Sequence, residues 1–256
     1  YVNASTGVLY AVGLVGASMR LRAVRGLNAP VDVATLLAPT AYERGYIRFD
    51  RGGYLYFGGS RTGGTLGDIE RVDTRALNAI TSLGYTAPVS DFAILSGQGT
   101  NARIVVTNLV TTSATSPITR WSRTGGIVSG AGAWELPDTD VTGADVTAGV
   151  AKPVGVTADG AIFVGNAVNV ASPSNNQGGI FKGKIVDNKL KFTHVGLSTA
   201  TAASVNAALS GVVASPNYAS DRAVFVSTNE GLLRSSALTG TISSDLIGWS
   251  TVLPKP

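Results

Sequence analysis

The sequence contains no cysteine and a single histidine, His194, among its 256 residues. Without cysteine there is no disulfide to staple the fold and no thiolate to act as a nucleophile or metal ligand. One histidine on its own cannot supply a typical zinc ligand set and argues against a Ser-His-Asp triad. The missing cysteine leaves the redox compartment open, because it fits both a reducing cytosol and an exported protein.

Charged residues are also scarce, at 14% of the chain, whereas hydrophobic residues make up 44%. Together with 32 Gly and 10 Pro, this balance suits a compact globular chain and excludes a solvated disordered tail. A chain of this length buries roughly three-quarters of the surface that it exposes when unfolded. It therefore needs no metal or disulfide to hold a core together.

The net charge of +4 is unevenly distributed along the chain. Residues 1–123 carry 12 Arg and 7 acidic residues, whereas residues 124–256 carry 8 basic and 9 acidic residues. Proteins that bind nucleic acid usually concentrate basic and aromatic residues on one element, but here the arginines are scattered. We therefore expect no nucleic-acid partner.

Lysine is rare, at 6 residues, beside 26 Thr and 23 Ser. This composition is typical of exported bacterial proteins, so we expect a secreted or cell-surface location, in a bacterium. The chain begins at Tyr1 rather than Met, which is consistent with processing, with truncation or with a fragment of a longer protein.

The uncharged stretch that precedes Arg20 is not expected to cross a membrane. Its apolar part, residues 7–17, is too short to span a bilayer as a helix and is rich in glycine. A signal peptide carries its positive charge before the apolar run, whereas Arg20 and Arg22 follow it. We expect a pair of strands here and no transmembrane segment.

Five short apolar runs recur along the chain, and each follows a turn cluster rich in Gly, Asn or Asp. The runs begin 46, 49, 58 and 62 residues apart, at Val8, Tyr54, Arg103, Ala161 and Ala223. An earlier apolar run lies before four of the turns, which predicts a hairpin. A third run with a basic residue and a fourth run complete each unit of about fifty residues.

Four antiparallel strands in a repeat of this size indicate a blade of a β-propeller. The second strand of each unit is almost continuously apolar, as expected when neighbouring blades cover both of its faces. We predict an all-β single domain, residues 1–256, of about five four-stranded antiparallel blades, with approximate bounds 1–38, 45–85, 91–138, 153–196 and 210–254. A larger propeller, of which this chain forms a part, stays open as an alternative.

Two segments fit the strand pattern poorly. An amphipathic helix is an alternative over residues 68–83, because five apolar residues fall there at roughly helical spacing, namely Ile69, Val72, Ala76, Ile80 and Leu83. The alanine-rich residues 201–209 predict a helical turn between the fourth and fifth units. The basic residues of the third strands are expected to lay their stems on the sheet and keep their charges in water.

The last unit, over residues 211–236, resembles the bacterial sialidase-type or Asp-box propeller repeats, which include sortilin-like proteins. That resemblance implies the blade described above, commonly closed by a Ser-x-Asp-x-Gly-x-Thr-Trp hairpin. In this chain the hairpin is degenerate, and its nearest equivalent runs from Ser122 to Trp134. No catalytic residues transfer with the resemblance, because propellers carry enzymes, ligand binders and scaffolds alike.

The acidic residues give little support for glycoside hydrolysis. That reaction needs two convergent carboxylates, and the chain has only four glutamates, at positions 43, 70, 135 and 230. We name no catalytic residues and expect the protein not to be an enzyme.

One acidic loop resembles the first half of a calcium-binding loop. Asp138, Asp140 and Thr142 place oxygen ligands at alternate positions, Gly143 follows, and Asp145 adds a carboxylate. The position where a bidentate glutamate is expected is Gly149, so the match is incomplete. A structural Ca²⁺ ion is the cofactor that this loop predicts, and an acidic solvated loop is the alternative.

The favoured functional hypothesis is a non-enzymatic extracellular structural or interaction module, such as a surface-layer, filament or adhesin component. Its partners would be other protein chains, copies of itself, or surface glycans. The alternative is a carbohydrate-binding module or Asp-box glycosidase, whose sugars would stack on exposed aromatic rings. Most of these rings are expected in the core; the candidates are Tyr54, Tyr56, Trp121, Trp134 and Trp249.

Overall fold

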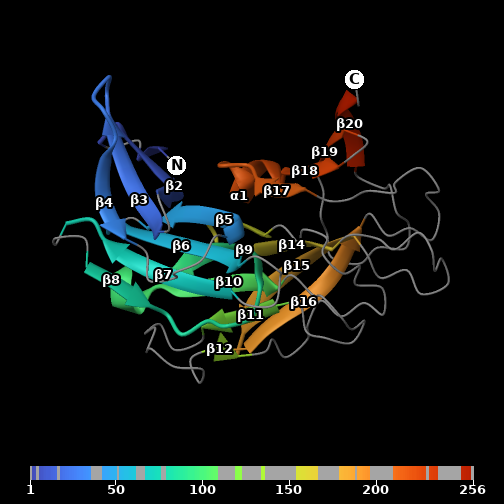
Figure 1. Ribbon diagram of the computed structural model, residues 1–256. Coiled ribbons are helices and arrows are strands. Elements are labelled where there is room, and N and C mark those ends of the chain that lie inside the picture. Colours follow the sequence, from blue (N-terminus) through green and yellow to red (C-terminus); the bar gives the residue numbers. More distant parts are fainter. Residues whose placement is uncertain are drawn as a thin grey trace.

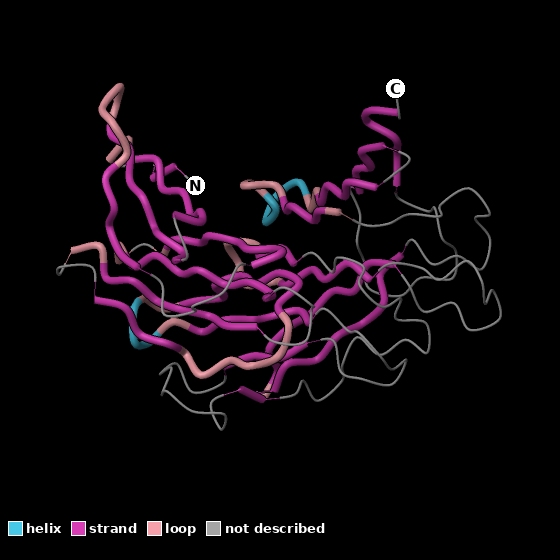
Figure 2. Tube along the Cα trace, in the orientation of Figure 1, coloured by secondary structure: helices cyan, strands magenta, loops and turns pink. Residues whose placement is uncertain are grey.

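A computed structural model of the chain contains five antiparallel sheets of four strands each. It describes residues 2–3, 6–15, 18–35, 42–50, 52–61, 67–75, 79–108, 119–122, 134–135, 154–166, 179–187, 189–196, 210–228, 231–235 and 249–254. In every sheet the strands lie side by side in sequence order. Figure 2 shows that strands dominate this part of the chain. Within it, no helix is both long and apolar enough to cross a membrane.

Each sheet is a meander of four consecutive strands (Figure 1). The first contains β1 (Val2–Asn3), β2 (Val8–Val15), β3 (Ser18–Arg25) and β4 (Val31–Thr35). The second contains β5 (Tyr42–Phe49), β6 (Tyr54–Arg61), β7 (Gly67–Asp73) and β8 (Ala79–Ser82). The third contains β9 (Val89–Ser96), β10 (Arg103–Asn108), β11 (Thr119–Ser122) and β12 (Trp134–Glu135).

The last two sheets follow the same order. The fourth contains β13 (Val154–Val156), β14 (Ile162–Asn166), β15 (Gly179–Val186) and β16 (Lys189–Gly196). The fifth contains β17 (Gly211–Ala214), β18 (Val224–Thr228), β19 (Gly231–Ser235) and β20 (Trp249–Pro254). Two short helical turns lie between first and second strands, η1 (Gly99–Asn101) in the third sheet and α1 (Tyr218–Asp221) in the fifth.

The sheets pack face to face in sequence order, as the blades of a propeller do, so the predicted all-β propeller fold is confirmed. One apolar cluster fills each of the four spaces between successive sheets. The first strands β5, β9, β13 and β17 contact one another in turn near the centre. The first and fifth sheets lie at the two ends of the row (Figure 1).

Side chains of the second strands alternate between the two neighbouring sheets, which explains their continuous apolar sequence. In β10, Ile104 and Val106 pack toward the second sheet, whereas Val105 packs toward the fourth. In β14, Val164 packs toward the third sheet and Phe163 toward the fifth. All five side chains are fully buried, because a strand between two sheets has no solvated face.

Three of the hairpins between first and second strands share one turn design. The first residue after the inner strand is Asp50, Thr157 or Ser215, and its backbone N–H donates to a carbonyl oxygen at 2.9–3.1 Å. Gly53 and Gly160 hold the positive φ angles, 84° and 82°, that close two of these turns. The third turn is extended by α1.

The suggested helix over residues 68–83 is wrong, because this segment forms β7 and β8, with a turn at Thr74 and Arg75 directly after β7. Ile69 and Val72 pack on opposite faces of β7, in different clusters, so their spacing reflects a strand covered on both sides. Arg71 also departs from expectation: it is buried and lies 5.5 Å from the Tyr54 ring centroid. The predicted turn over residues 201–209 lies outside the described residues.

The alternation of second-strand side chains between neighbouring sheets predicts that two phenylalanines at equivalent positions contribute unequally to stability. Phe163 is fully buried between the fourth and fifth sheets, whereas Phe225 is only partly buried, on the far face of the fifth sheet. Phe163→Ala is therefore expected to lower the free energy of unfolding by about 3–5 kcal/mol. Phe225→Ala, the matched control, should cost clearly less, about 1–2 kcal/mol, since no described sheet packs on the far side of its ring. Urea unfolding measures both, and equal losses would contradict the packing described.

Candidate functional site

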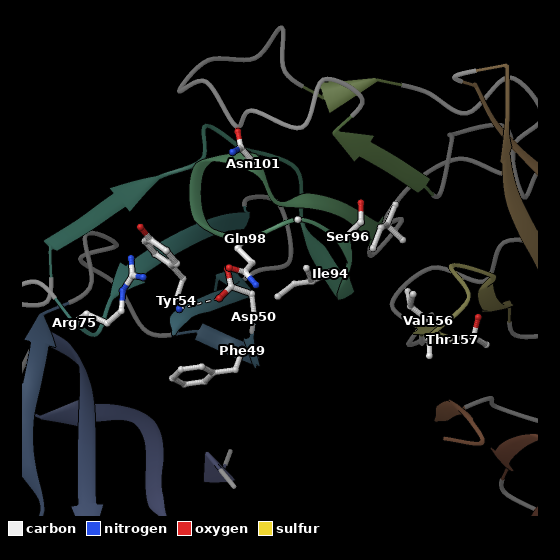
Figure 3. Close-up of a pocket in the computed structure, with 13 residues that line it drawn as sticks. Phe49, Asp50, Tyr54, Arg75, Ile94, Ser96, Gln98, Asn101, Val156 and Thr157 are labelled. Atoms are coloured by element: carbon white, nitrogen blue, oxygen red, sulfur yellow. Dashed lines mark hydrogen bonds between the residues drawn. The ribbon is translucent and has the colours of Figure 1, made fainter. Parts of the chain in front are cut away.

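A polar cavity of about 890 Å³ opens where the hairpin turns of the second, third and fourth sheets meet (Figure 3). The turn after β5 contributes Asp50 and the start of β6 contributes Tyr54, the turn after β9 contributes Gln98 and Asn101, and the turn after β13 contributes Thr157. The remaining described lining residues are Phe49, Arg75, Ile94, Leu95, Ser96, Gly97, Val156 and Ala158. Three separate repeats thus build one concave surface.

Asp50 organises the floor of this cavity. One carboxylate oxygen, Oδ1, accepts from the backbone N–H groups of Gly52 and Tyr54, at 2.8 and 3.0 Å. The other, Oδ2, accepts from the Tyr56 hydroxyl at 3.0 Å and from the Gly99 N–H of the next sheet at 2.7 Å. A carboxylate offers about four acceptor positions, so these four bonds saturate it.

Tyr56 remains a neutral hydrogen-bond donor. Burial and the adjacent Asp50 carboxylate raise the pKa of its phenol well above the ordinary value. Its hydroxyl also lies 3.1 Å from the Gly99 carbonyl oxygen. Asp50 and Tyr56 together fix the second sheet against the third at the cavity floor.

Arg75 and Asp73 form an ion pair at the rim. The guanidinium Nε lies 3.1 Å from Asp73 Oδ1, and this contact lowers the pKa of the Asp73 carboxyl to about 2. The same guanidinium lies 4.3 Å from the centroid of the Tyr54 ring. The arginine is therefore paired with a carboxylate and lies against an aromatic face.

Neutral groups complete the cavity. Ser96, Gln98 and Asn101 are exposed at its surface and offer hydroxyl and amide groups. Gly52 leaves the room in which Gln98 lies, because a Cβ atom there would meet its Oε1 at 2.8 Å. Among the described lining residues Asp50 is the one carboxylate, and its lone pairs are all occupied. The cavity can therefore bind polar ligands but offers no free acid or base there.

A second cavity, of about 480 Å³, lies along the inner strands of the second to fifth sheets. Its polar group is Arg48 of β5, which donates to Asp91 Oδ1 of β9 at 2.5 Å and to the Phe92 carbonyl oxygen at 3.0 Å. The backbone N–H of Val154, in β13, donates to Asp91 Oδ2 at 3.0 Å. This buried carboxylate thus joins three sheets near the centre.

Several residues singled out from the sequence lie elsewhere. The calcium loop of Asp138, Asp140, Thr142 and Asp145 lies outside the described residues, as do the side chains of Trp121 and Trp249. Tyr56 is fully buried, and Trp134 packs edge-on against Tyr85 in the core. Tyr54 does line the cavity. Across the described residues, no group of three His, Cys, Asp or Glu side chains could hold a metal ion.

The sequence did not point to Asp50, Asp91 or Arg48. Asp50 falls in a predicted turn, where aspartate is expected for conformational reasons alone. A polar residue directly after an apolar inner strand recurs as Thr157 and Ser215, and this recurrence was the signal that could have found Asp50. Arg48 and Asp91 are 43 residues apart, and only the inter-sheet register brings them together.

No protein-family model and no curated protein sequence matches the chain. Several solved structures are similar to it in fold. The GH74 xyloglucanase from Xanthomonas campestris is similar at a TM-score of 0.58 and 13% identity, over 95% of this chain and 36% of that enzyme. Aleuria aurantia lectin in complex with alpha-methyl-L-fucoside is similar at a TM-score of 0.51 and 10% identity, over 100% of this chain and 76% of the lectin.

A further structure of that lectin, described as a six-bladed β-propeller with a novel fucose recognition mode, has a TM-score of 0.50 and 11% identity. It matches 98% of this chain and 74% of its own. Identities this low show the fold alone, and the chain spans little more than a third of the xyloglucanase. The propeller implied by the sialidase-type resemblance is confirmed, whereas membership of the Asp-box family stays a prediction.

The Arg48–Asp91 pair predicts a pH-dependent loss of stability. Burial raises the pKa of Asp91, and Arg48 acts in the opposite direction. In Arg48→Met the folded-state pKa rises further, so the folded state binds a proton more tightly than the unfolded chain. Stability then falls as the pH rises from the ordinary value of 3.8 through the raised pKa.

We therefore expect Arg48→Met to lose about 2–3 kcal/mol at about pH 8 and clearly less at about pH 5. Urea unfolding at both pH values measures the difference. The control is Arg22→Met, which removes an exposed contact with Asp32 and should cost less than about 1 kcal/mol at either pH. A loss from Arg48→Met that does not change with pH would show that Asp91 is not a desolvated partner.

Proposed function

We propose that the protein is a non-enzymatic binding module that holds a neutral carbohydrate in the cavity formed by the second, third and fourth sheets. One observation carries this proposal: the cavity exposes neutral amide and hydroxyl groups, while Asp50, its one carboxylate among the described lining residues, is saturated by four internal hydrogen bonds. Sugars are recognised by such neutral groups beside apolar carbon.

The cavity supplies both kinds of surface. Gln98 and Asn101 can each donate and accept, which matches the paired hydroxyls of a sugar ring. Phe49 and Ile94 offer apolar surface for the carbon face of the ring. A volume of about 890 Å³ accommodates one or two sugar residues. The fucose-bound lectin with the same fold supports a glycan as the ligand, at the level of fold analogy only.

Hydrolysis is the less favoured function at this cavity. Retaining and inverting glycosidases need two free carboxyl groups, one that protonates the leaving group and one that acts as nucleophile or activates water. Asp50 accepts four hydrogen bonds, and Asp73, outside the lining, is engaged by Arg75. These contacts favour binding without turnover, in keeping with the interaction module expected from the composition. A secreted or cell-surface setting belongs to the same proposal and rests on that composition.

Glycan-array screening followed by calorimetry tests the proposal. Asn101→Ala and Gln98→Ala are each expected to weaken binding of the best glycan about tenfold, since each removes a hydrogen-bonding group worth roughly 1.4 kcal/mol. Asn28→Ala is the matched control, because Asn28 is exposed on the turn after β3, and it should leave the affinity unchanged. The proposal fails if no glycan binds or if the three variants bind alike, and hydrolysis of the bound glycan would overturn its non-enzymatic part.

Calcium binding by Asp138, Asp140, Thr142 and Asp145 stays a separate prediction. A hard cation held by several oxygen ligands of the folded loop raises stability by mass action. Added Ca²⁺ is therefore expected to raise the melting temperature by roughly 2–4 °C and to slow proteolysis of the loop. Asp138→Asn with Asp140→Asn should abolish both effects, whereas Mg²⁺ should not reproduce them. An unchanged melting temperature in Ca²⁺ would leave the loop as a solvated acidic segment.

A further inference from the structure

The outer face of the fifth sheet is apolar, and no other described sheet packs against it. Val212, Val224 and Val226 pack toward the fourth sheet, so their neighbours in β17 and β18 point the opposite way. Val213 is 63% exposed and Phe225 is half-buried, and the two are partners in adjacent strands. Two leucines of β19 and β20 extend this face, namely Leu232 and Leu253.

The outer face of the first sheet has the same character. Tyr10 and Val12 of β2 pack toward the second sheet, so the alternate positions point away from it. These positions include Leu9, Ala11 and Val15, all of which are exposed. Both ends of the row of sheets therefore present an unburied apolar face of a kind that every described internal sheet buries.

The comparison with the internal sheets shows what is missing. Val105 and Phe163 occupy the second strands of the third and fourth sheets, and the following sheet buries each completely. Phe225 is the next member of this series, and the Arg234 guanidinium lies over its ring, 6.0 Å from the centroid, where a following sheet would pack. The fifth sheet thus has the same apolar side chains that join each internal sheet to the next, but no described sheet packs against them.

The two outer faces carry an excess of positive charge. Arg20 and Arg22 project from β3 on the outer face of the first sheet and share a single carboxylate, Asp32. Arg234 is exposed on the outer face of the fifth sheet. A structure that covers both faces is therefore expected to bring acidic residues to them, because opposite charges across an interface fix its register.

We propose that one further four-stranded antiparallel sheet, a sixth repeat of the same polypeptide, fills the space between the first and fifth sheets and completes a six-bladed propeller. The lectin that matches 98% of this chain over 74% of its own length is six-bladed, which supports one additional sheet. Each of the five sheets is formed by consecutive strands of the chain, so a contiguous repeat is the natural source of a sixth.

A second copy of the chain does not fit this space. It would enter with one of its end sheets, and the sheet packed beside that one would overlap the first or fifth sheet of its partner. The occupant is therefore a single sheet. Its second strand is expected to be apolar on both faces, and acidic residues should lie opposite Arg22 and Arg234.

The absence of cysteine makes the space measurable. Spin labels on Ala11→Cys and Ser227→Cys place one probe on the outer face of β2 and one on that of β18. In the 256-residue chain the labelled sheets should lie about 20 Å apart, which is two sheet spacings, rather than the roughly 10 Å of direct packing. A separation of one sheet spacing would overturn the proposal, because the ring would then close with five sheets.

Thiol labelling of Ala11→Cys identifies the occupant. The thiol is expected to react freely in the 256-residue chain and roughly 100-fold more slowly in the complete gene product from its own cells, where it would need local opening. Ala93→Cys, buried between the third and fourth sheets, should be protected in both, and Ala219→Cys, exposed on α1, should react in both.

Each outcome decides the inference. Protection of Ala11→Cys in the complete, monomeric gene product supports a sixth repeat of the same polypeptide. Free reaction in that product overturns the proposal, as does protection that requires a second polypeptide. The result is independent of the carbohydrate proposal, because Ala11 lies in the first sheet and the cavity is built from the second to fourth sheets.

Discussion

Burial of both faces of every sheet is the constraint on which the rest of the structure depends. A four-stranded sheet of apolar second strands is not stable alone in water, since each face needs a partner. The chain meets this need by repetition: Val105 contacts the sheet that follows, while Ile104 and Val106 contact the one before. Stability is therefore shared among neighbouring sheets, and the sheets at the two ends are the least supported.

Polar contacts near the centre fix the position of three sheets relative to one another, which the apolar packing alone does not. Sheets that meet through alternating apolar side chains could slide relative to one another, because the hydrophobic effect has no direction. Asp91 accepts from Arg48 of the preceding sheet and from the Val154 N–H of the following one, which fixes three inner strands at one level. Asp50 does the same for two hairpin turns. Asp50 lies in the wall of the cavity, and Asp91 holds the inner strands that lead into its turns.

The sequence was sufficient to predict the architecture, because five apolar runs at similar spacing leave few alternatives. It was ambiguous over residues 68–83, where Ile69, Val72 and Ile80 satisfy a helical period and equally a buried strand followed by a turn. The cavity could not be predicted, since Gln98 and Thr157 belong to different repeats and meet only through packing. Arg48 and Asp91 were invisible for the same reason, as neither lies in a local motif.

The division between scaffold and binding surface follows from the same constraint. Side chains in the middle of the sheets are committed to neighbouring sheets, so their identity is limited to apolar residues that fill the space. In the turns between first and second strands, some residues such as Asp50 and Gly99 join neighbouring sheets, but the exposed side chains carry no such commitment. Ser96, Gln98 and Asn101 can therefore be chosen for a ligand without disturbing the core. A repeat fold of this kind forms its concave surface by combining turns from successive sheets, so a ligand in the proposed site would contact three repeats at once, and its recognition would depend on their register.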